Sequence, residues 1–370
     1  MKQPYYAFPY TVILPARGSV YRRGEASMVR VDNDRVLIAY ANHSHHQSSD
    51  ISPIEGDNDT ADICIMTLYR EGKPHGIEQT ILRCPKNTLN VMSPALRQLP
   101  NGKLGMLYSH RTSKKRAARM FIESSDHGMT WSTPAVVAEG GYTTGCHDRM
   151  TVLSTNRIIA PLHRTDDWDR HYLYAQTACS DDCGRHWKLS NQVTLPYISM
   201  QYGWTGGFIE SGCVEPSVAE CADGSLLMSV RTAMGTLFCA RSFDAGASWG
   251  DLRSMEVISP QAPAHLSRIP RTNDLLLLWT SDYDLSVDLS GVRNTIMACV
   301  STDNGKTWRH DRRKTLIHDP DHSVDYPAVL YLDDEVWITF RQSSTTMISG
   351  GNTSSCLMRV PLEWFYSCEN

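Results

Sequence analysis

The chain has 370 residues, with 36 Lys and Arg against 40 Asp and Glu, and 41% of the residues are hydrophobic. This near balance of charge argues against nucleic acid or an anionic membrane surface as the main partner. No stretch approaches the roughly 20 apolar residues needed to cross a bilayer. Because Met1 to Arg17 lack a basic start, a long apolar core and a cleavage site, we expect a cytoplasmic protein without a signal peptide.

Six segments have the pattern of a β-hairpin, in which an alternating apolar strand, a short polar turn and a second apolar strand follow one another. The turn expected in the last of them is Asp334-Glu335. Six hairpins predict six sheets. In chain order the segments are 25–40, 93–108, 147–162, 215–230, 265–280 and 326–341.

An octapeptide of the form Ser-x-Asp-x-Gly-x-x-Trp is interleaved with these hairpins. Its Asp can accept backbone N–H bonds, its Gly supplies a positive φ, and its Trp can pack beneath the turn. We therefore interpret it as a structural turn and expect the four Trp side chains in the core. The copies begin at Ser124, Ser180, Ser242 and Ser301.

In the middle of the chain each hairpin is followed by a loop and by a strand that ends in the octapeptide, so each unit holds four short strands. Short four-stranded antiparallel sheets repeated radially form a β-propeller. The sequence therefore predicts an all-β fold, a single six-bladed propeller over residues 1–370. Residues 10–14 or 355–360 are expected to complete a sheet begun at the other end of the chain.

Aligning the hairpins on their turns places two rings of polar residues at one end of the central axis. We expect these side chains to converge on one mouth, where they form a binding or catalytic site or line a solvated channel. The first ring contains Glu25, Ser93, His147, Glu215, His265 and Tyr326, and the second contains Ala41, Ser109, His163, Arg231, Ser281 and Gln342.

The octapeptides resemble the Asp boxes of the sialidase (neuraminidase) superfamily, and the hairpins resemble its bacterial neuraminidase repeats. The segment from Glu215 through Asp223-Gly224 to Arg231 is similar to the family segment that carries a catalytic Glu and a substrate-binding Arg. Arg293 and Tyr326 lie where the family places another substrate-binding Arg and the nucleophilic Tyr.

The resemblance implies an exo-glycosidase that hydrolyses a terminal acidic sugar, a sialic acid or a related ulosonic acid, without a metal or other cofactor. An Arg cluster can clamp the carboxylate of such a sugar bidentately. A carboxylate nucleophile would be repelled by the substrate, whereas the hydroxyl of Tyr326 is neutral and Glu215 can remove its proton.

The resemblance also implies a general acid in the loop after the first hairpin. Asp59 is the working choice, although the sequence does not decide between it and Asp50, Asp57 or Asp62. The family begins its first hairpin with Arg-Ile-Pro, and this chain offers Arg22 or Arg23 instead, of which Arg23 is the working choice for the third clamp arginine.

Other residues are candidates for binding the sugar. Glu25 lies beside the expected clamp and opposes a substrate carboxylate, which favours a different sugar. A metal held by the two histidines of the third hairpin is disfavoured, because no further ligand spacing supports it. The remaining candidates are His147, Arg149 and His163 on the third hairpin, Ser93 on the second, and Trp204, which can stack on a pyranose ring.

Two alternatives remain beside the acidic-sugar hydrolase. One is a glycosidase or lyase of the same fold that acts on a neutral or uronic sugar. The other is a non-catalytic propeller that binds a glycan or a protein. In each case the expected partner is a glycan or oligosaccharide, or a protein for the last, and the oligomeric state is open. The eleven scattered cysteines are expected to be mostly buried thiols.

Overall fold

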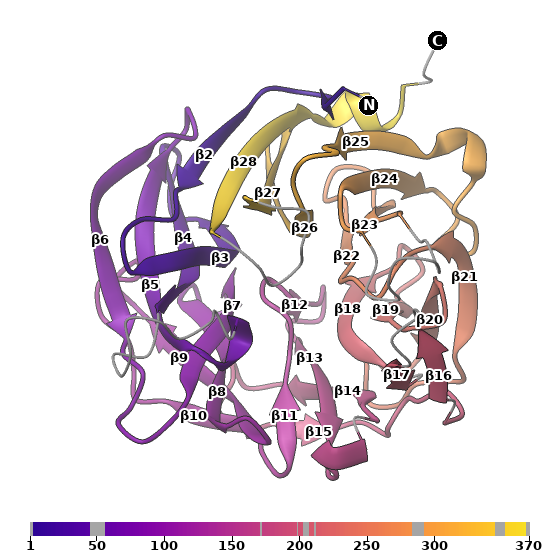
Figure 1. The fold of residues 1–370 in the computed structure, drawn as a ribbon, viewed down its shortest axis with the longest axis horizontal. Helices are drawn as coiled ribbons and strands as arrows, with labels where there is room; N and C mark the ends of the chain where they lie inside the picture. Colours follow the sequence, from indigo (N-terminus) through magenta and orange to yellow (C-terminus); the bar gives the residue numbers. More distant parts are fainter. Residues whose placement is uncertain are drawn as a thin grey trace.

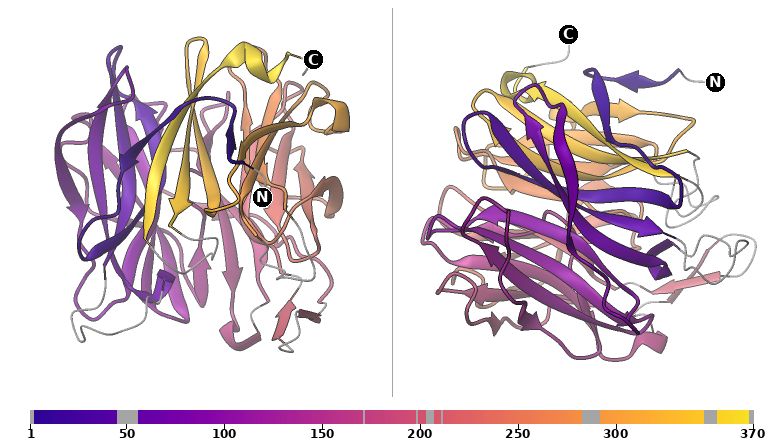
Figure 2. Two further views of the ribbon diagram at one scale, coloured as in Figure 1. Left: turned by 45° about the horizontal axis from the view of Figure 1, so that its top comes forward. Right: turned by 90° about the vertical axis from the view of Figure 1, so that its left-hand side faces the viewer.

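The computed structural model describes residues 3–44, 56–170, 172–197, 199–202, 207–210, 212–282, 292–344 and 352–367. Within these ranges the fold is all-β, and the helical segments are short 3-10 turns at Gly56–Asn58 (η1), Trp168–Arg170 (η2), His310–Arg312 (η3) and Leu362–Phe365 (η4). The sheets follow one another around a centre in chain order (Figure 1), and Figure 2 shows them from two other sides. No helix of the described residues has the length and apolar character required to span a membrane.

All six predicted hairpins are present as antiparallel strand pairs. In the last hairpin Leu332 pairs with Glu335, so its turn is Asp333-Asp334 and the predicted turn was wrong by one residue. The pairs are β3 (Val20–Arg30) with β4 (Arg35–Ser44), β7 (Asn90–Gln98) with β8 (Leu104–Ser113), β12 (Thr151–Val152) with β13 (Ile158–Thr165), β18 (Val214–Glu220) with β19 (Leu226–Arg231), β22 (His265–Arg268) with β23 (Leu275–Thr280), and β26 (Val324–Leu332) with β27 (Glu335–Ser343).

Each hairpin is extended outward by a third strand and then by a fourth. The third strands are β5 (Thr60–Tyr69), β9 (Arg116–Ser124), β14 (Tyr174–Ser180), β20 (Thr236–Ser242), β24 (Thr295–Ser301) and β28 (Thr353–Pro361). The fourth strands are β6 (Pro74–Leu82), β10 (Ala135–Ala138), β15 (Lys188–Leu189), β21 (Arg253–Ile258), β25 (Lys314–His318) and β2 (Tyr10–Leu14).

Neighbouring units are joined in two places, so the hairpins do not lie in six separate sheets. A parallel pairing of Thr353 with Arg22 connects β28 to β3. A short strand β11 (Tyr142–Thr144) pairs with β13 on one side and with β9 on the other. The described sheets therefore have nine, eight, five, four and two strands, the five-stranded one ending in β1 (Tyr5–Tyr6) and the two-stranded one formed by β16 (Ser199–Tyr202) and β17 (Gly207–Glu210).

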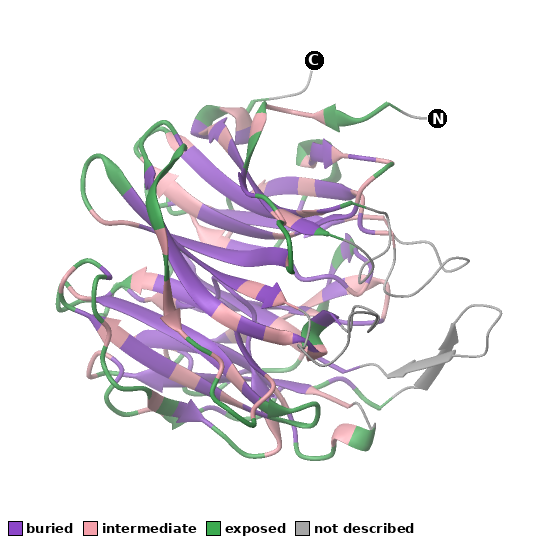
Figure 3. Cartoon of the chain, turned by 60° about the vertical axis from the view of Figure 1, so that its left-hand side comes forward, coloured by how far each residue is buried: buried purple, intermediate pink, exposed green. Residues whose placement is uncertain are grey.

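The first and last parts of the chain share a sheet. β2 pairs antiparallel with β28, with Tyr10 opposite Met358, and Figure 1 shows these two strands side by side. This confirms the expectation that residues 10–14 complete a sheet begun at the other end. Ile13 and Leu14 are buried there, and Leu14 belongs to a core cluster with Trp337 and Leu357. Figure 3 shows such buried positions along the interior of the strands.

The octapeptides form four copies of one turn. In the first, the Gly128 N–H donates to Ser124 Oγ over 2.8 Å, and the Thr130 N–H donates to Asp126 Oδ1 over 2.9 Å. Gly128 has a φ of 91°, as the turn requires. Trp249 and Trp308 are buried as expected, but Trp131 and Trp187 are only partly buried. The indole N–H of each of the latter two donates to the glycine carbonyl of its own turn, which keeps the ring over that turn.

Candidate functional site

Four of the innermost strands, β3, β7, β18 and β26, share one repeated backbone distortion. The pairing with the second strand shifts by a residue, and a residue within the shift takes a positive φ, which is unfavourable for any side chain beyond glycine. The same bulge occurs at equivalent positions in four strands, and it directs four side chains toward the same end of the axis. These residues are Glu25 (φ 57°), Ser93 (φ 55°), Glu215 (φ 47°) and Tyr326 (φ 54°), all from the first predicted ring.

Tyr326 and Glu215 meet across the mouth. The Tyr326 hydroxyl donates to Glu215 Oε1 over 2.9 Å. Burial raises the pKa of Tyr326 well above its ordinary value, and the Glu215 charge adds to this effect. The phenol is therefore neutral and directed at a carboxylate that can take its proton.

The second predicted ring supplies two partners for Glu215. Arg231 donates to Glu215 Oε2 over 2.5 Å, and the backbone N–H of Glu215 donates to His163 Nδ1 over 3.3 Å. Burial opposes ionisation of Glu215, but Arg231 and His163 outweigh it and hold the pKa of Glu215 below its ordinary value. Burial lowers the pKa of His163 to about 4. The result is an ionised Glu215 beside a neutral His163.

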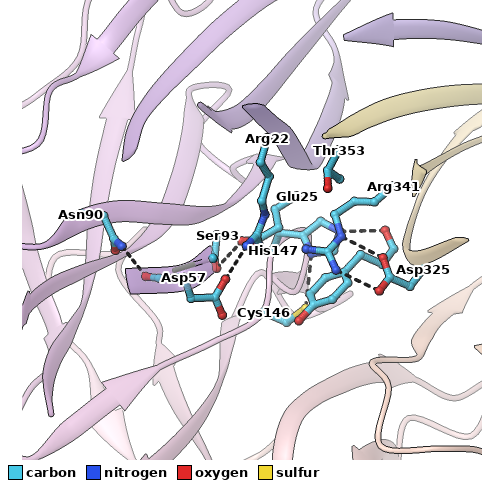
Figure 4. A network of polar contacts seen from close by, with 12 residues as sticks. Arg22, Glu25, Asp57, Asn90, Ser93, Cys146, His147, Asp325, Arg341 and Thr353 are labelled. Carbon is cyan, nitrogen blue, oxygen red and sulfur yellow. Dashed lines mark hydrogen bonds and ion pairs between the residues drawn. The ribbon is translucent and has the colours of Figure 1, made fainter. Parts of the chain in front are cut away.

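Two further arginines surround the Tyr326 ring and share one buried carboxylate. Arg341 makes two hydrogen bonds to Asp325, of 2.8 and 2.9 Å, and its guanidinium carbon lies 3.8 Å from the centre of the Tyr326 ring. Arg293 donates to Asp325 Oδ2 over 2.9 Å and lies 6.0 Å from the same ring centre. Figure 4 shows Arg341 and Asp325 in this network. Gly24 leaves room for Arg341, since a Cβ there would lie 2.9 Å from Arg341 Cδ.

Arg341 and Asp325 were missed by the sequence analysis. In the fourth hairpin, Arg231 lies seven residues after the second turn residue. In the sixth hairpin, the same count starts from Glu335, which is not a turn residue, and therefore selects Gln342. Gln342 lies away from the mouth, where it donates to Tyr6 and Tyr10. Counting seven residues from the true second turn residue, Asp334, gives Arg341. The turn of the sixth hairpin has two residues and is shorter than the loops of the other hairpins. A count that allowed for this shorter turn would have selected Arg341.

A second polar cluster on β3 and β7 lies beside the first. Arg22 is ion-paired with Glu25 and donates to Asp57 Oδ1 over 2.5 Å, and the Ser93 hydroxyl donates to Glu25 Oε2 over 2.6 Å. Figure 4 shows Arg22 between the two carboxylates. Asn90 and Arg111 both donate to the backbone carbonyl of Asp57 and fix its position.

The structure corrects the choice of Arg23 as a mouth residue. Arg23 faces the outer side of β3, where it contacts Glu78, Tyr40 and Asn42. A regular strand would place Arg23 and Glu25 on one face, because side chains alternate. The bulge between Gly24 and Ser27 adds a residue, so Arg22 and Glu25 share the face instead.

The structure also corrects the working choice of Asp59. Asp59 is buried and accepts a hydrogen bond of 2.5 Å from the Tyr21 hydroxyl. Asp62 accepts from the Cys84 N–H over 2.7 Å, and Asp50 lies outside the described residues. Asp57, with a side chain 56% exposed, remains beside Arg22. Desolvation by the surrounding residues opposes the ionisation of Asp57, but the charges of Arg22 and Arg111 hold its pKa far below its ordinary value.

His147 and Arg149 are buried beneath the residues that form the mouth, against the backbone of Tyr326 and Pro327. His147 is fully buried, its Nε2 lies 3.2 Å from the Tyr326 carbonyl oxygen, and its Nδ1 lies 3.3 Å from Cys146 Sγ. Burial lowers the pKa of His147 well below its ordinary value, so a neutral ring links the thiol to the backbone of the strained Tyr326. Arg149 does not face the mouth, contrary to prediction, since it bonds to His265 Nδ1 and the Ala264 and Pro327 carbonyls.

The remaining predictions concern His265, Trp204 and metal binding. His265 is buried against Arg149, beneath the mouth, so the first ring does not converge completely. Trp204 lies outside the described residues. Among the described residues, no group of three or more His, Cys, Asp or Glu side chains is arranged to hold a metal ion.

The fold and this repeat structure are those of the sialidase-like superfamily. Residues 54–338 match the family model described as the BNR repeat-like domain, and the chain belongs to this family. A search of curated proteins found no match.

Solved structures share the fold at low sequence identity. A Dyadobacter fermentans protein described as of unknown function is 16% identical with a TM-score of 0.71, and the match covers 97% of this chain and all of that one. Trypanosoma rangeli sialidase in complex with 2,3-difluorosialic acid, a covalent intermediate, is 15% identical with a TM-score of 0.67, over 98% of this chain and 58% of that one. The NanB sialidase of Streptococcus pneumoniae is 11% identical with a TM-score of 0.70, over 96% of this chain and 71% of that one.

Proposed function

We propose that the protein is a retaining exo-glycosidase that removes a terminal acidic sugar, a sialic acid or a related ulosonic acid, from a glycan. The observation that most supports this proposal is the hydrogen bond of 2.9 Å from the Tyr326 hydroxyl to Glu215, within a group of arginines. We also propose that the six four-stranded units form a six-bladed β-propeller in one domain, with this site at one end of its axis.

Tyr326 is the nucleophile and Glu215 is its base. The Tyr326 oxygen bonds to the anomeric carbon as its proton passes to Glu215 Oε1, and the glycosidic bond breaks. In the second step a water molecule attacks the same carbon, the tyrosyl–sugar bond breaks, and Glu215 returns the proton to the phenolate. The neutral nucleophile suits a sugar with a carboxylate on the reacting carbon, because no negative charge approaches that carboxylate before proton transfer.

Asp57 is the proposed acid for the leaving oxygen. In the free protein it is ion-paired with Arg22 and ionised, so it cannot donate a proton in that state. A substrate carboxylate that binds Arg22 replaces Asp57 as its partner, and the pKa of Asp57 then rises. Binding of an acidic sugar thereby prepares the acid. After the first step the same carboxylate takes a proton from the attacking water.

The substrate carboxylate is proposed to bind Arg22 together with Arg293 and Arg341. The latter two lie beside the Tyr326 ring and are held by a single carboxylate, Asp325. One carboxylate cannot neutralise two guanidinium groups, so a positive charge remains for the substrate. Arg231 is already paired with Glu215 and contributes mainly by orienting it.

A neutral or uronic sugar is the second candidate, and Glu25 favours it. This buried carboxylate lies on the mouth side of β3, where it engages Arg22 and Ser93. The positive charge left at Arg293 and Arg341 is local. Over the whole mouth, four carboxylates face four arginines, so the free site carries little net charge; the carboxylates are Glu25, Asp57, Glu215 and Asp325.

Fluorogenic glycosides of N-acetylneuraminic acid, a uronic acid and neutral hexoses separate the candidates. Release from the sialoside supports the first, and release from another sugar alone supports the second. Incubation with 2,3-difluorosialic acid followed by peptide mass spectrometry tests the mechanism, since a sugar adduct on the Tyr326 peptide is expected. Absence of turnover and of adduct, with ligand still raising the melting temperature, indicates a binding protein instead.

A further inference from the structure

A cavity lies at the end of the inner strands opposite the mouth. It has a volume of about 620 Å³, and Tyr326, Glu215 and Arg231 are not among its lining residues. The inner strands run from the mouth toward their turns, and the cavity is lined by their far ends, such as Met28–Arg30 on β3 and Ser217–Glu220 on β18. It therefore lies on the same axis as the mouth, beyond the residues that form the mouth's floor.

Arg149 is a buried cation in the wall of this cavity. It is 2% exposed, and its described hydrogen bonds go to neutral acceptors, namely His265 Nδ1 at 2.8 Å, the Ala264 carbonyl at 2.9 Å and the Pro327 carbonyl at 3.2 Å. Its Nε has no hydrogen-bond partner within the described structure. A buried guanidinium without a carboxylate partner is costly, and a bound anion would offset that cost.

His265 supplies a second unused donor beside it. A guanidinium can only donate, so His265 Nδ1 accepts from Arg149 and the neutral ring carries its proton on Nε2. This Nε2 is buried and has no partner among the residues described, while His265 lines the cavity. Both atoms are buried behind the cavity wall, so an anion in the cavity would stabilise the Arg149 charge through its proximity rather than through a bond to these two donors.

The carboxylates of the cavity are already engaged. Asp148 accepts from the Ser27 hydroxyl at 2.7 Å and from Arg97 at 2.6 Å, and Glu220 accepts from the Ser154 N–H at 2.9 Å. Four arginines line the cavity, and three of them have a carboxylate partner, Arg30 in Asp333, Arg97 in Asp148 and Arg268 in Glu220. Among the described residues, the positive charge left without a carboxylate partner is that of Arg149. The arginines are Arg30, Arg97, Arg149 and Arg268.

We propose that this axial cavity binds a small oxyanion, a metabolite that carries a carboxylate or a phosphate. Its volume is within the range of about 300–1,000 Å³ that small-molecule sites occupy. The site is separate from the proposed glycosidase site, and binding of the oxyanion requires no turnover.

Isothermal titration of the full chain with sodium phosphate and with sodium glucuronate tests this, with sodium chloride at equal ionic strength as the salt control. Both oxyanions are expected to bind, and the tighter one identifies the preferred group. Gln98→Glu adds a negative charge at an exposed lining position and is expected to weaken binding on the order of fivefold. Gln192→Glu makes the same change at an exposed position away from the lining residues and is expected to leave binding unchanged.

A second variant keeps the test independent of any misfolding of the first. Arg268→Gln removes a partly exposed lining charge and is expected to weaken binding in the same way. Failure of the wild-type chain to bind either oxyanion above the chloride control overturns the proposal. Equal binding by wild type, Gln98→Glu and Arg268→Gln also overturns it, because the anion is then held elsewhere, for example by the mouth arginines. Since the measurement is of binding, its failure leaves the proposed hydrolysis untouched.

Discussion

Tyr326 on β26 and Glu215 on β18 lie 111 residues apart in the chain and share a hydrogen bond of 2.9 Å. Each has a positive φ, and each lies near the start of an inner strand, within a pairing shift. Two strained residues from different units thus form one proton-transfer pair, an arrangement typical of backbone strain at functional sites.

Tyr326→Phe and Glu215→Gln are expected to lower kcat by at least 10³-fold and 10²-fold respectively. The first removes the attacking oxygen, and the second removes the base while keeping a group that can accept from the tyrosine. The folded state should persist in both, because ring packing on Arg341 and the size of residue 215 are conserved. Steady-state kinetics on the released sugar check this, and a loss below tenfold in Tyr326→Phe contradicts the mechanism.

Asp57→Asn and Asp59→Asn are expected to behave differently. Asp57→Asn should reduce kcat/KM by 10²- to 10⁴-fold on alkyl glycosides and by much less on aryl glycosides whose leaving group departs without a proton. Asp59→Asn should affect both substrates equally and lower stability by about 1–3 kcal/mol, because it weakens the bond to Tyr21. Equal losses on both leaving groups in Asp57→Asn would mean that another group is the acid.

Arg341→Gln is expected to destabilise the fold by about 3 kcal/mol and to raise KM for an acidic sugar more than tenfold. It removes two bonds to the buried Asp325, which then retains Arg293. Arg359→Gln is the matched control, since it breaks a bidentate pair with Glu335 at side chains 37% and 40% exposed, where about 0–1 kcal/mol is expected. Urea unfolding measures both. Similar losses in the two variants would contradict the buried role of Arg341.

Stability is expected to fall as the pH drops from about 6.5 to about 4. Burial lowers the pKa of His163 to about 4, whereas the unfolded chain binds this proton near pH 6.5. Between these values the unfolded state binds more protons, so acidification favours unfolding, by at most about 3 kcal/mol for this residue. His147 and His265 act in the same direction, because burial lowers their pKa values too.

The variant His163→Gln isolates this effect. Glutamine can still accept the Glu215 N–H through its side-chain oxygen but does not titrate. Its melting temperature should therefore fall less steeply between pH 6.5 and 4 than that of the wild type. An unchanged slope would show that His163 has the same pKa in the folded and unfolded states, and would contradict the effect of burial on it.

The hairpins were accessible from sequence because strand alternation and turn residues repeat at a fixed offset, and the pairing of Tyr326 with Glu215 followed from the family resemblance. The same offset failed for Arg341, since the last turn is shorter, and for Arg22, since a bulge reverses the alternation. Neither a shortened turn nor a bulge can be recognised readily from the local amino-acid sequence. Asp57 lies in the irregular turn η1, and Asp59 lies directly after it. Side chains in such a turn do not alternate regularly, so the sequence does not show which of the two faces the mouth. Only their contacts with Arg22 and Tyr21 distinguish them.

Deletion of residues 1–16 is expected to lower the melting temperature by about 5–15 °C. It removes β2 and leaves the outer edge of β28 unpaired. Loss of the buried Ile13 and Leu14 alone costs about 3–6 kcal/mol at about 1.5–3 kcal/mol per side chain. Deletion of residues 1–4 is the control, because it leaves β1 and β2 intact, and a change of at most about 2 °C is expected. If the longer deletion melted like the full chain, pairing of β2 with β28 would contribute nothing to closing the fold. Scanning calorimetry of the three chains at one protein concentration gives the comparison.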